Sequence, residues 1–224
     1  MIRFSSAALV VALLFFSSAV SAQEYVEGVH FTKAANASPP RRDGKIDVVE
    51  VFSYMCPHCA TFQPFVKNWH SKMPENVSFS RIPAIFSASW QPFALSYYTA
   101  ETMGILDQAH VAMCNAIHRE RKQFRSMDDL AGFYSQFGVT SDEFLSMSKS
   151  FPVDMKLRNG VKWTGGSGWG IQSTPTLVVA GKYRVNASQA VPQSEVMKVV
   201  NFLVAKEAVQ QPQVSASAEP ADSE

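Results

Sequence analysis

The strongest constraint on the fold is a stretch of chain in which an apolar segment runs directly into two cysteines. Residues 46–54, IDVVEVFSY, are almost continuously apolar and rich in β-branched and aromatic side chains, which predicts a strand buried on both faces. Cys56 and Cys59 follow, and Pro57 between them suits the first turn of a helix. An amphipathic helix pattern comes next, and residues 77–82 then alternate as a second strand does. This order predicts two parallel strands joined by a right-handed crossover.

The two ends of the chain have the character of segments outside the folded domain. Residues 1–22 carry a positive charge near their start, at Arg3, followed by an apolar run over 7–16 and by small residues at the end. This pattern predicts a secretory signal peptide removed after about Ala22. The alternative, a membrane anchor, is disfavoured because the run falls short of the ~20 residues that a spanning helix needs. Residues 208–224 are rich in Gln, Ser, Ala, Pro and acids and predict a disordered tail.

Composition limits the classes of partner and scaffold. The chain of 224 residues is 46% apolar, enough to bury a sizeable core in one domain that carries an insertion. Its net charge of +1 provides no field of one sign that would attract nucleic acid. Three cysteines cannot form two disulfides, which excludes a scaffold held by several of them.

The middle of the chain changes character after the second predicted strand. Residues 85–163 show repeated helical patterns and little strand signal, so we expect an all-helical subdomain inserted between residues 23–84 and residues 164–207. The candidate helices are 90–103, 107–121, 127–136, 141–148 and 152–163. Ser126 and Ser141 are expected to cap the third and the fourth of them.

Strand character returns in the last part of the core. Residues 176–180, TLVVA, predict a buried strand, and residues 183–185 are expected to pair with it across a tight turn. Residues 192–206 close the domain with an amphipathic helix, and a short edge strand is expected at 28–32. The order of elements predicts an α/β fold with an all-helical insertion.

The Cys56–Cys59 pair lies within disulfide reach, at a place where a helix stabilises negative charge. Free backbone N–H groups and the helix dipole favour an anion there, so the pKa of Cys56 is expected below that of an ordinary thiol. The protonated ring of His58, or its N–H, is expected to add to this effect, and Cys59 is expected to be more buried. Cys56 is therefore predicted to attack or be attacked, and Cys59 to resolve the mixed disulfide. A stabilised thiolate favours the reduced form and makes the disulfide an oxidant.

Two other interpretations of the cysteine pair are less well supported by the sequence. A structural disulfide would close a very small loop and gain little stability from it, and it gives His58 no purpose. A zinc site normally needs four ligands, but the sequence has no second Cys-x-x-Cys and no His-x-x-x-His. Redox chemistry is favoured over both.

The segment VVEVFSYMCPHC and the helix after it resemble the active-site region of the DsbA family of periplasmic disulfide oxidases. The order of elements is similar to that family from about residue 24 to 206. The resemblance implies a thioredoxin fold with an inserted all-helical subdomain. A second match is the run GIQSTPT at 170–176, because thioredoxin-like folds place a cis proline there that faces the cysteines. Pro175, preceded by Thr174, is the matching position, and the resemblance implies a cis bond.

Glu50 interrupts the apolar run of the first strand, six positions before Cys56. A strand buried on both faces should not hold a carboxylate without reason, and the alternative is an exposed position on a one-sided strand. The DsbA family has an acid at this position, which implies a buried acid that helps proton movement at Cys59. Arg81 is either its charge partner or a solvated strand end. Gln63 departs from the family, in which some members carry an acid.

The third cysteine, Cys114, falls on one helical face with Val111 and Ile117. It is expected to be a small buried hydrophobe, because free cysteine is often fully buried. A regulatory or intermolecular thiol is the alternative.

These features predict an exported thiol–disulfide oxidoreductase that donates its disulfide to reduced exported proteins through a mixed disulfide at Cys56. The expected site residues are Cys56, Pro57, His58, Cys59, Thr174, Pro175 and Glu50. No cofactor is expected beyond the Cys56–Cys59 disulfide, and the protein is expected to be a monomer in the bacterial periplasm. The resemblance implies re-oxidation by a membrane quinone oxidoreductase of the DsbB type.

Three alternatives remain open. A disulfide isomerase or reductase of the same fold is the nearest, because Thr174 before the proline also resembles those enzymes, although too little chain precedes the first core strand for a dimerisation domain. A non-enzymatic peptide-binding module with an inert disulfide predicts that Cys56→Ser preserves function. A zinc-binding module predicts bound metal in the reduced protein.

Overall fold

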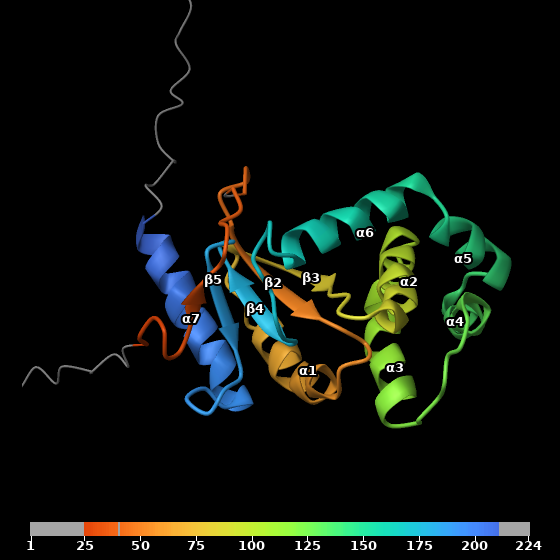
Figure 1. Ribbon diagram of the computed structural model, residues 1–224, viewed down its shortest axis with the longest axis horizontal. Helices are drawn as coiled ribbons and strands as arrows, with labels where there is room; N and C mark the ends of the chain where they lie inside the picture. The colour runs from red at the N-terminus through yellow and green to blue at the C-terminus, as the bar shows by residue number, and fades with distance from the viewer. Residues whose placement is uncertain (1–24, 40, 211–224) are drawn as a thin grey trace, which may run out of the picture.

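The computed structural model of the chain describes residues 25–39 and 41–210, so the predicted signal peptide and most of the predicted tail lie outside the described residues. The described strands form one five-stranded sheet in the order β1-β5-β4-β2-β3, and a block of helices stands beside it (Figure 1). The strands are β1 (Thr32–Lys33), β2 (Ile46–Phe52), β3 (Val77–Pro83), β4 (Thr176–Val179) and β5 (Tyr183–Asn186).

Strand β2 is the centre of the fold. All of its residues except Asp47 are buried, as its nearly continuous apolar sequence predicts. β2 runs parallel to β3, to which it is joined by the crossover helix α1 (Pro57–His70), and antiparallel to β4. The predicted strand–helix–strand unit is therefore confirmed, and so is the hairpin that β4 and β5 form.

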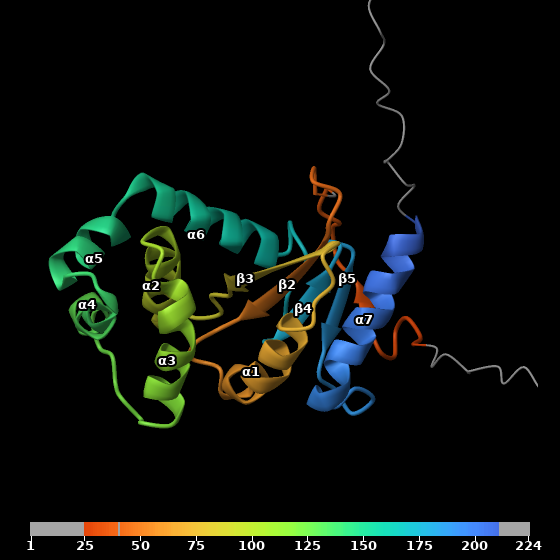
Figure 2. The same ribbon diagram turned by 180° about the vertical axis from the view of Figure 1, so that it is seen from behind.

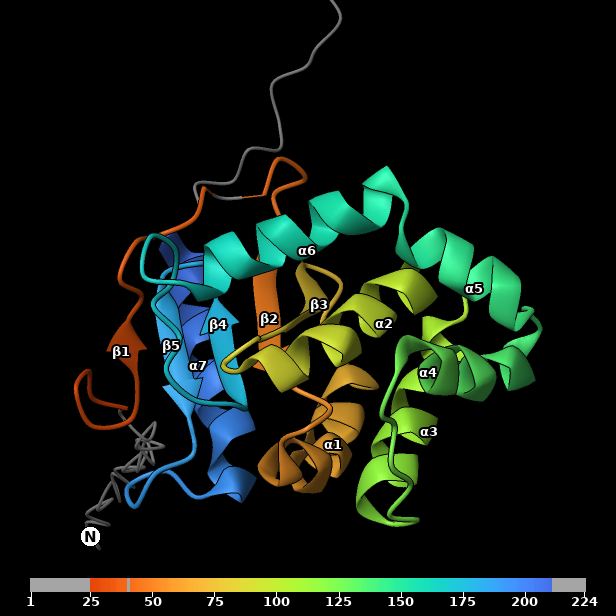
Figure 3. The ribbon, with the colours of Figure 1, turned by 45° about the vertical axis from the view of Figure 1, so that its right-hand side comes forward.

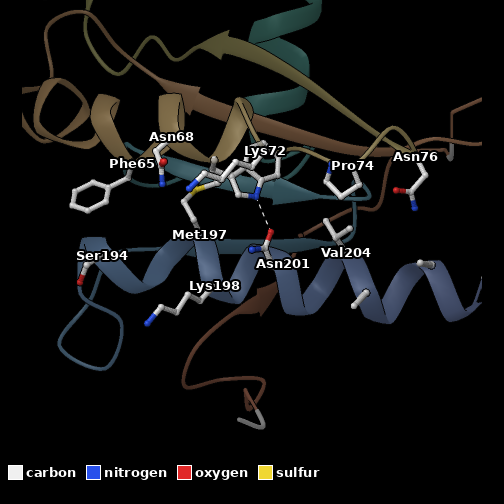
Figure 4. Close-up of a pocket in the computed structure, with 13 residues that line it drawn as sticks. Phe65, Asn68, Lys72, Pro74, Asn76, Ser194, Met197, Lys198, Asn201 and Val204 are labelled. Atoms are coloured by element: carbon white, nitrogen blue, oxygen red, sulfur yellow. Dashed lines mark hydrogen bonds between the residues drawn. The ribbon is translucent and has the colours of Figure 1, made fainter. Parts of the chain in front are cut away.

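Helices cover both faces of the sheet. α1 and α7 (Gln193–Gln210) lie on one face, where the Trp69 indole N–H donates a hydrogen bond to Asn201 Oδ1 at 2.7 Å. Figure 4 shows this bond across a groove of about 580 Å³ between the two helices. The end of α6 (Phe151–Thr164) packs on the opposite face (Figure 3). There Trp163 stacks on Trp169 with ring centroids 5.5 Å apart. Burial from both sides explains why β2 needs no polar face.

The helical block lies between β3 and β4 in the chain. Besides α6 it contains α2 (Gln91–Thr102), α3 (Leu106–His118), α4 (Met127–Tyr134), α5 (Ser141–Ser148) and the short 3₁₀ turns η1 (Ala88–Trp90) and η2 (Ser135–Phe137). Ser126 caps α4 in a reciprocal capping box with Asp129, as predicted. The prediction for α5 is wrong by one position. Thr140 is the cap, because its hydroxyl accepts the Glu143 N–H, and Ser141 is already helical.

Several predicted boundaries also differ from the structure; the second candidate helix, for example, was predicted to end at 121, but α3 ends at His118. The edge strand was expected at 28–32, but β1 begins only at Thr32, because Gly28 adopts a φ of +85° and the residues around it form a turn. Helix α7 continues to Gln210, past the predicted end at 206. It continues because Glu207 is still buried, where it pairs with Lys182. None of the helices within the described ranges is long and apolar enough to cross a membrane.

Candidate active site

The two cysteines lie in the first turn of α1, where the sheet meets the helical block. Cys56 is the N-cap, with φ −93° and ψ 113°, and Pro57 opens the helix. No side chain caps this helix terminus, so its first N–H groups are free to face the Cys56 sulfur. Both cysteines are free thiols here, and Cys59, at 1% exposed, is more buried than Cys56, at 7%, as predicted.

The pKa of the Cys56 thiol is lowered to about 5. The largest cause is a hydrogen bond from the Cys59 thiol, and burial opposes it. The Thr174 side chain and the backbone N–H groups of Cys59 and His58 lower the pKa further. Part of the stabilisation therefore comes from the N–H groups of the first helical turn, as expected for a thiolate at a helix N-terminus.

The Cys59 thiol is shifted in the opposite direction. The hydrogen bond to Cys56 raises the pKa of Cys59 most, and burial and the negative charge of Cys56 raise it further. The Glu50 carboxylate adds a smaller contribution of the same sign. One proton therefore stays on Cys59 when Cys56 ionises.

His58 contributes to the Cys56 pKa through an N–H, one of the two groups expected. Its ring is exposed, and the contribution that His58 makes to the Cys56 pKa comes from its backbone N–H. The N–H contribution is therefore made by the peptide group, while the His58 ring is exposed to solvent. The His58 carbonyl accepts hydrogen bonds from Thr61 Oγ1 at 3.0 Å and from Gln193 Nε2 at 3.1 Å. The second bond ties the cysteine turn to the start of α7.

The loop before β4 faces the cysteines. The Thr174–Pro175 peptide is cis, as the resemblance implies. Cys56 Sγ lies 3.3 Å from the Thr174 carbonyl oxygen, and the Thr174 side chain also contributes to the Cys56 pKa. The Thr176 hydroxyl donates to the Ser173 carbonyl at 2.7 Å and holds the loop at the start of the strand. The structure therefore brings Thr174 and Pro175 to the cysteine pair.

Glu50 and Arg81 form an ion pair close to Cys59. They are direct neighbours in the β2–β3 register, and Arg81 Nε donates to Glu50 Oε2 at 2.8 Å. The Glu50 side chain is fully buried and the Arg81 side chain is 21% exposed. Burial is the main cause that raises the pKa of Glu50, and the charge of Arg81 opposes it. Glu50 Oε1 has no hydrogen-bond partner among the described residues. The buried position and the pairing are thus as the functional interpretation expected.

A cavity of about 600 Å³ lies between α1 and α3, with Gln63, Arg81 and Cys114 in its wall. Cys114 is 5% exposed and packs in the core of the helical block, as predicted for a small buried hydrophobe. Burial raises its pKa to about 12. Within the described ranges, no group of three or more His, Cys, Asp or Glu residues is placed to hold a metal ion.

Three residues that the sequence did not single out also contact the site. Tyr54, two positions before Cys56, places its hydroxyl 3.1 Å from His110 Nδ1, and its carbonyl accepts a hydrogen bond from His118 Nε2 at 2.7 Å. Both histidines belong to α3, far along the chain from Tyr54. The only sequence signal was their spacing of eight positions on one predicted helix, which places them on the same face.

A dithiol at the N-terminus of a helix, with one thiol of lowered pKa and the loop of Thr174 and Pro175 against it, is typical of a thiol–disulfide oxidoreductase. The chain is 34% identical over 192 residues to the thiol:disulfide interchange protein DsbA of Pseudomonas aeruginosa, covering 86% of this chain and 90% of that protein. It is 35% identical over 202 residues to the DsbA of Pseudomonas syringae pv. tomato, covering 90% and 94%. No protein-family model matches. The chain belongs to the DsbA family.

Solved structures of DsbA proteins confirm the fold. The crystal structure of Pseudomonas aeruginosa DsbA superposes with a TM-score of 0.76 at 33% identity, covering 83% of this chain and 96% of that one. The DsbA oxidoreductase of Xylella fastidiosa superposes with a TM-score of 0.74 at 30% identity, covering 80% and 96%. The fold is thus a thioredoxin fold with a helical insertion.

Proposed function

We propose that the protein donates its Cys56–Cys59 disulfide to reduced, unfolded exported proteins through a mixed disulfide at Cys56. The observation that carries this proposal is the difference between the two thiols, with the pKa of Cys56 lowered to about 5 and that of Cys59 raised. Stabilising the Cys56 thiolate stabilises the reduced protein. The disulfide is then easily reduced and is a good oxidant of other thiols.

The reaction begins when a substrate thiolate attacks the Cys56 sulfur of the disulfide. A bond forms between Cys56 and the substrate, the Cys56–Cys59 bond breaks, and its electron pair leaves on Cys59. In the mixed disulfide Cys56 carries no charge, but burial and, to a smaller extent, the Glu50 carboxylate still raise the pKa of Cys59, so this sulfur takes up a proton. Glu50, whose Oε1 has no partner among the described residues, is proposed to move that proton. Protonation prevents Cys59 from attacking the mixed disulfide again.

The second step releases the oxidised substrate. Another substrate thiolate attacks the substrate sulfur of the mixed disulfide, and the electron pair leaves on Cys56. This thiolate needs no proton at neutral pH because its pKa is about 5, and a thiolate of low pKa leaves readily. Two electrons pass from the substrate to the protein, one substrate proton remains on Cys59, and the other goes to solvent.

The substrate is expected to lie along Thr174 and Pro175. This loop reaches the Cys56 sulfur, and an extended peptide bound there by main-chain contacts brings its own cysteine to Cys56. Residues 1–22 are proposed to direct the chain to the periplasm, where it acts as a monomer. A membrane quinone oxidoreductase of the DsbB type is proposed to re-oxidise it.

The test is the transfer of a disulfide to a reduced, unfolded model protein by the fully oxidised chain. We expect one disulfide transferred per molecule and the loss of this transfer in Cys56→Ser. Sustained oxidation by Cys56→Ser would contradict the proposal, and an oxidised, unchanged protein that transfers no disulfide would favour an inert disulfide in a peptide-binding module. Rearrangement of wrongly paired disulfides faster than oxidation of thiols would favour an isomerase.

A further inference from the structure

A tight turn carries Cys56 to the start of α1, and Tyr54 and Met55 are its two middle residues. The Cys56 N–H donates to the Ser53 carbonyl at 3.1 Å, which is the bond that closes a β-turn. The peptide between the two middle residues has no partner within the backbone of such a turn. Its C=O, from Tyr54, and its N–H, from Met55, must be satisfied from outside because the site is largely buried.

Both groups of this central peptide have a partner. The Met55 N–H donates to Ser53 Oγ at 3.1 Å, which is a local bond. The Tyr54 carbonyl accepts from His118 Nε2 at 2.7 Å, which is a bond from the helical block. A carbonyl oxygen only accepts, so His118 Nε2 carries the hydrogen. His118 is half-buried and is the last residue of α3.

The side chain of Tyr54 is held by the same helix. Tyr54 is 1% exposed, its hydroxyl lies 3.1 Å from His110 Nδ1, and its ring packs against the His110 ring with centroids 5.4 Å apart. Figure 2 shows α3 beside the segment that leads from β2 into α1. The helical block therefore holds this turn at two points, one on the main chain and one on the side chain.

We propose that His118 is a positioning residue for the dithiol, because its hydrogen bond to the Tyr54 carbonyl fixes the central peptide of the turn that presents Cys56. Type I and type II turns differ mainly by a rotation of this peptide, so one bond to its carbonyl selects one orientation. The inference rests on the proposed oxidase function and extends it to a residue outside the thioredoxin fold.

The hydrogen bond from His118 should affect the stability of the Cys56 thiolate. The groups that stabilise its thiolate include the N–H groups of His58 and Cys59 and the Thr174 side chain. Hydrogen bonds weaken steeply when donor and acceptor are misaligned. Without the bond from His118 the turn relaxes and these donors lose alignment, so the thiolate becomes less stable and the disulfide less oxidising.

The experiment compares His118→Leu, which has no donor, with His118→Gln, whose amide nitrogen can take the place of Nε2. His70→Leu is the control, because His70 is also the last residue of its helix, α1, but is exposed. Two quantities are measured: the pH midpoint of thiolate absorbance and the equilibrium constant with glutathione. For His118→Leu we expect a midpoint raised by about half a unit or more and an equilibrium shifted about threefold towards the disulfide. His118→Gln and His70→Leu should match the unchanged protein.

Two results would overturn the inference. The first is a midpoint and an equilibrium constant for His118→Leu equal to those of the unchanged protein. The second is His118→Gln shifted as far as His118→Leu, which means that the ring and not the donor matters. If His118→Leu does not fold, His118→Asn, which is polar but too short to reach, takes its place. The thiolate titration of the His118 variants tests the inference by itself. If the disulfide of the unchanged protein opens only in strongly reducing buffer, the proposed oxidase function fails instead.

Discussion

The two thiols of α1 are the same chemical group one helical turn apart, yet they differ in every property that matters for exchange. Cys56 is at the helix N-terminus, where N–H groups and Thr174 surround its sulfur and lower its pKa to about 5. Cys59 lies one turn further along the helix. There its hydrogen bond to Cys56, its burial and the negative charges of Cys56 and Glu50 raise its pKa. Position relative to the free N–H groups, and not residue type, therefore decides which sulfur is the thiolate.

The contrast also shows that each cysteine depends on the other. The hydrogen bond from Cys59 is the largest cause of the low Cys56 pKa, and the same bond is the largest cause of the high Cys59 pKa. The pair consequently holds one proton and one negative charge when reduced. That charge is lost when the disulfide forms, so the protein environment favours the reduced state over the oxidised one.

The largest expected effect comes from removing each sulfur in turn. Cys56→Ser should abolish transfer of the disulfide, because no Cys56–Cys59 disulfide can form and the remaining buried Cys59 thiol is a poor nucleophile. With a disulfide-bonded substrate, Cys59→Ser should still attack through Cys56, release one substrate sulfur as a thiolate and accumulate the mixed disulfide, since no second sulfur resolves it. Gel separation under non-reducing conditions measures both. Equal amounts of mixed disulfide in the two variants would contradict the difference in reactivity between Cys56 and Cys59.

The pH dependence of the reduction potential is the second test. Above about pH 5, reduction adds two electrons but only one proton, at Cys59, so the potential should fall by about 30 mV per pH unit. Below that pH both sulfurs are protonated on reduction, and the slope should steepen to about 60 mV. A pair of ordinary thiols would keep the steep slope up to about pH 8.5. Equilibration with a dithiol of known potential at several pH values gives the slope.

A smaller effect is expected on the rate at which Cys59 attacks a mixed disulfide, and it should distinguish the buried carboxylate of Glu50 from that of Glu207. Glu50→Gln removes the acceptor near Cys59, so attack of Cys59 on a Cys56–glutathione mixed disulfide should slow by up to about a hundredfold, the low end for a positioned acid–base. The matched control is Glu207→Gln, because Glu207 is 2% exposed and paired with Lys182 at the far end of α7. Both variants should lose about 1–3 kcal/mol of unfolding free energy, since each leaves a buried partner less well paired. Equal rates in the two variants would contradict a role for Glu50.

The smallest effect is expected at the third cysteine. Cys114→Ala should leave the thiolate titration and disulfide transfer unchanged and should cost about 1 kcal/mol of stability, because it opens a small space in the core. Thermal unfolding of the reduced protein measures the loss. A shift in the Cys56 midpoint would show that Cys114 belongs to the redox site after all.

Much of the fold was readable from the sequence because its signals are local. The unbroken apolar run of β2 and the cap at Ser126 each report their own segment, and the structure has both. Pro175 and Glu50 needed more than local signals. Pro175 looks like any proline before a strand, and Glu50 is ambiguous until Arg81 is seen beside it in the register. For these two, the family resemblance supplied what local pattern does not carry.

What the sequence did not predict are contacts between distant segments. The bonds from His118 and His110 to Tyr54 join α3 to the turn before Cys56, and the spacing of the two histidines on one helix does not say which residue they contact. At His58 the sequence left open whether the ring or an N–H would stabilise Cys56, and the structure shows an exposed ring and a backbone N–H that lowers the Cys56 pKa. Side-chain direction and tertiary contact, unlike the type of element, are not encoded over a few residues.

The central claim is that the surroundings of Cys56 stabilise the reduced protein. It is tested most directly by equilibrating the Cys56–Cys59 disulfide with glutathione buffers of known ratio at neutral pH. Opening of the disulfide in mildly reducing buffer is the result predicted here, because a thiolate of pKa about 5 favours the reduced form. A disulfide that opens only in strongly reducing buffer would contradict the account, since the helix terminus and Thr174 would then not stabilise Cys56 enough to make an oxidant.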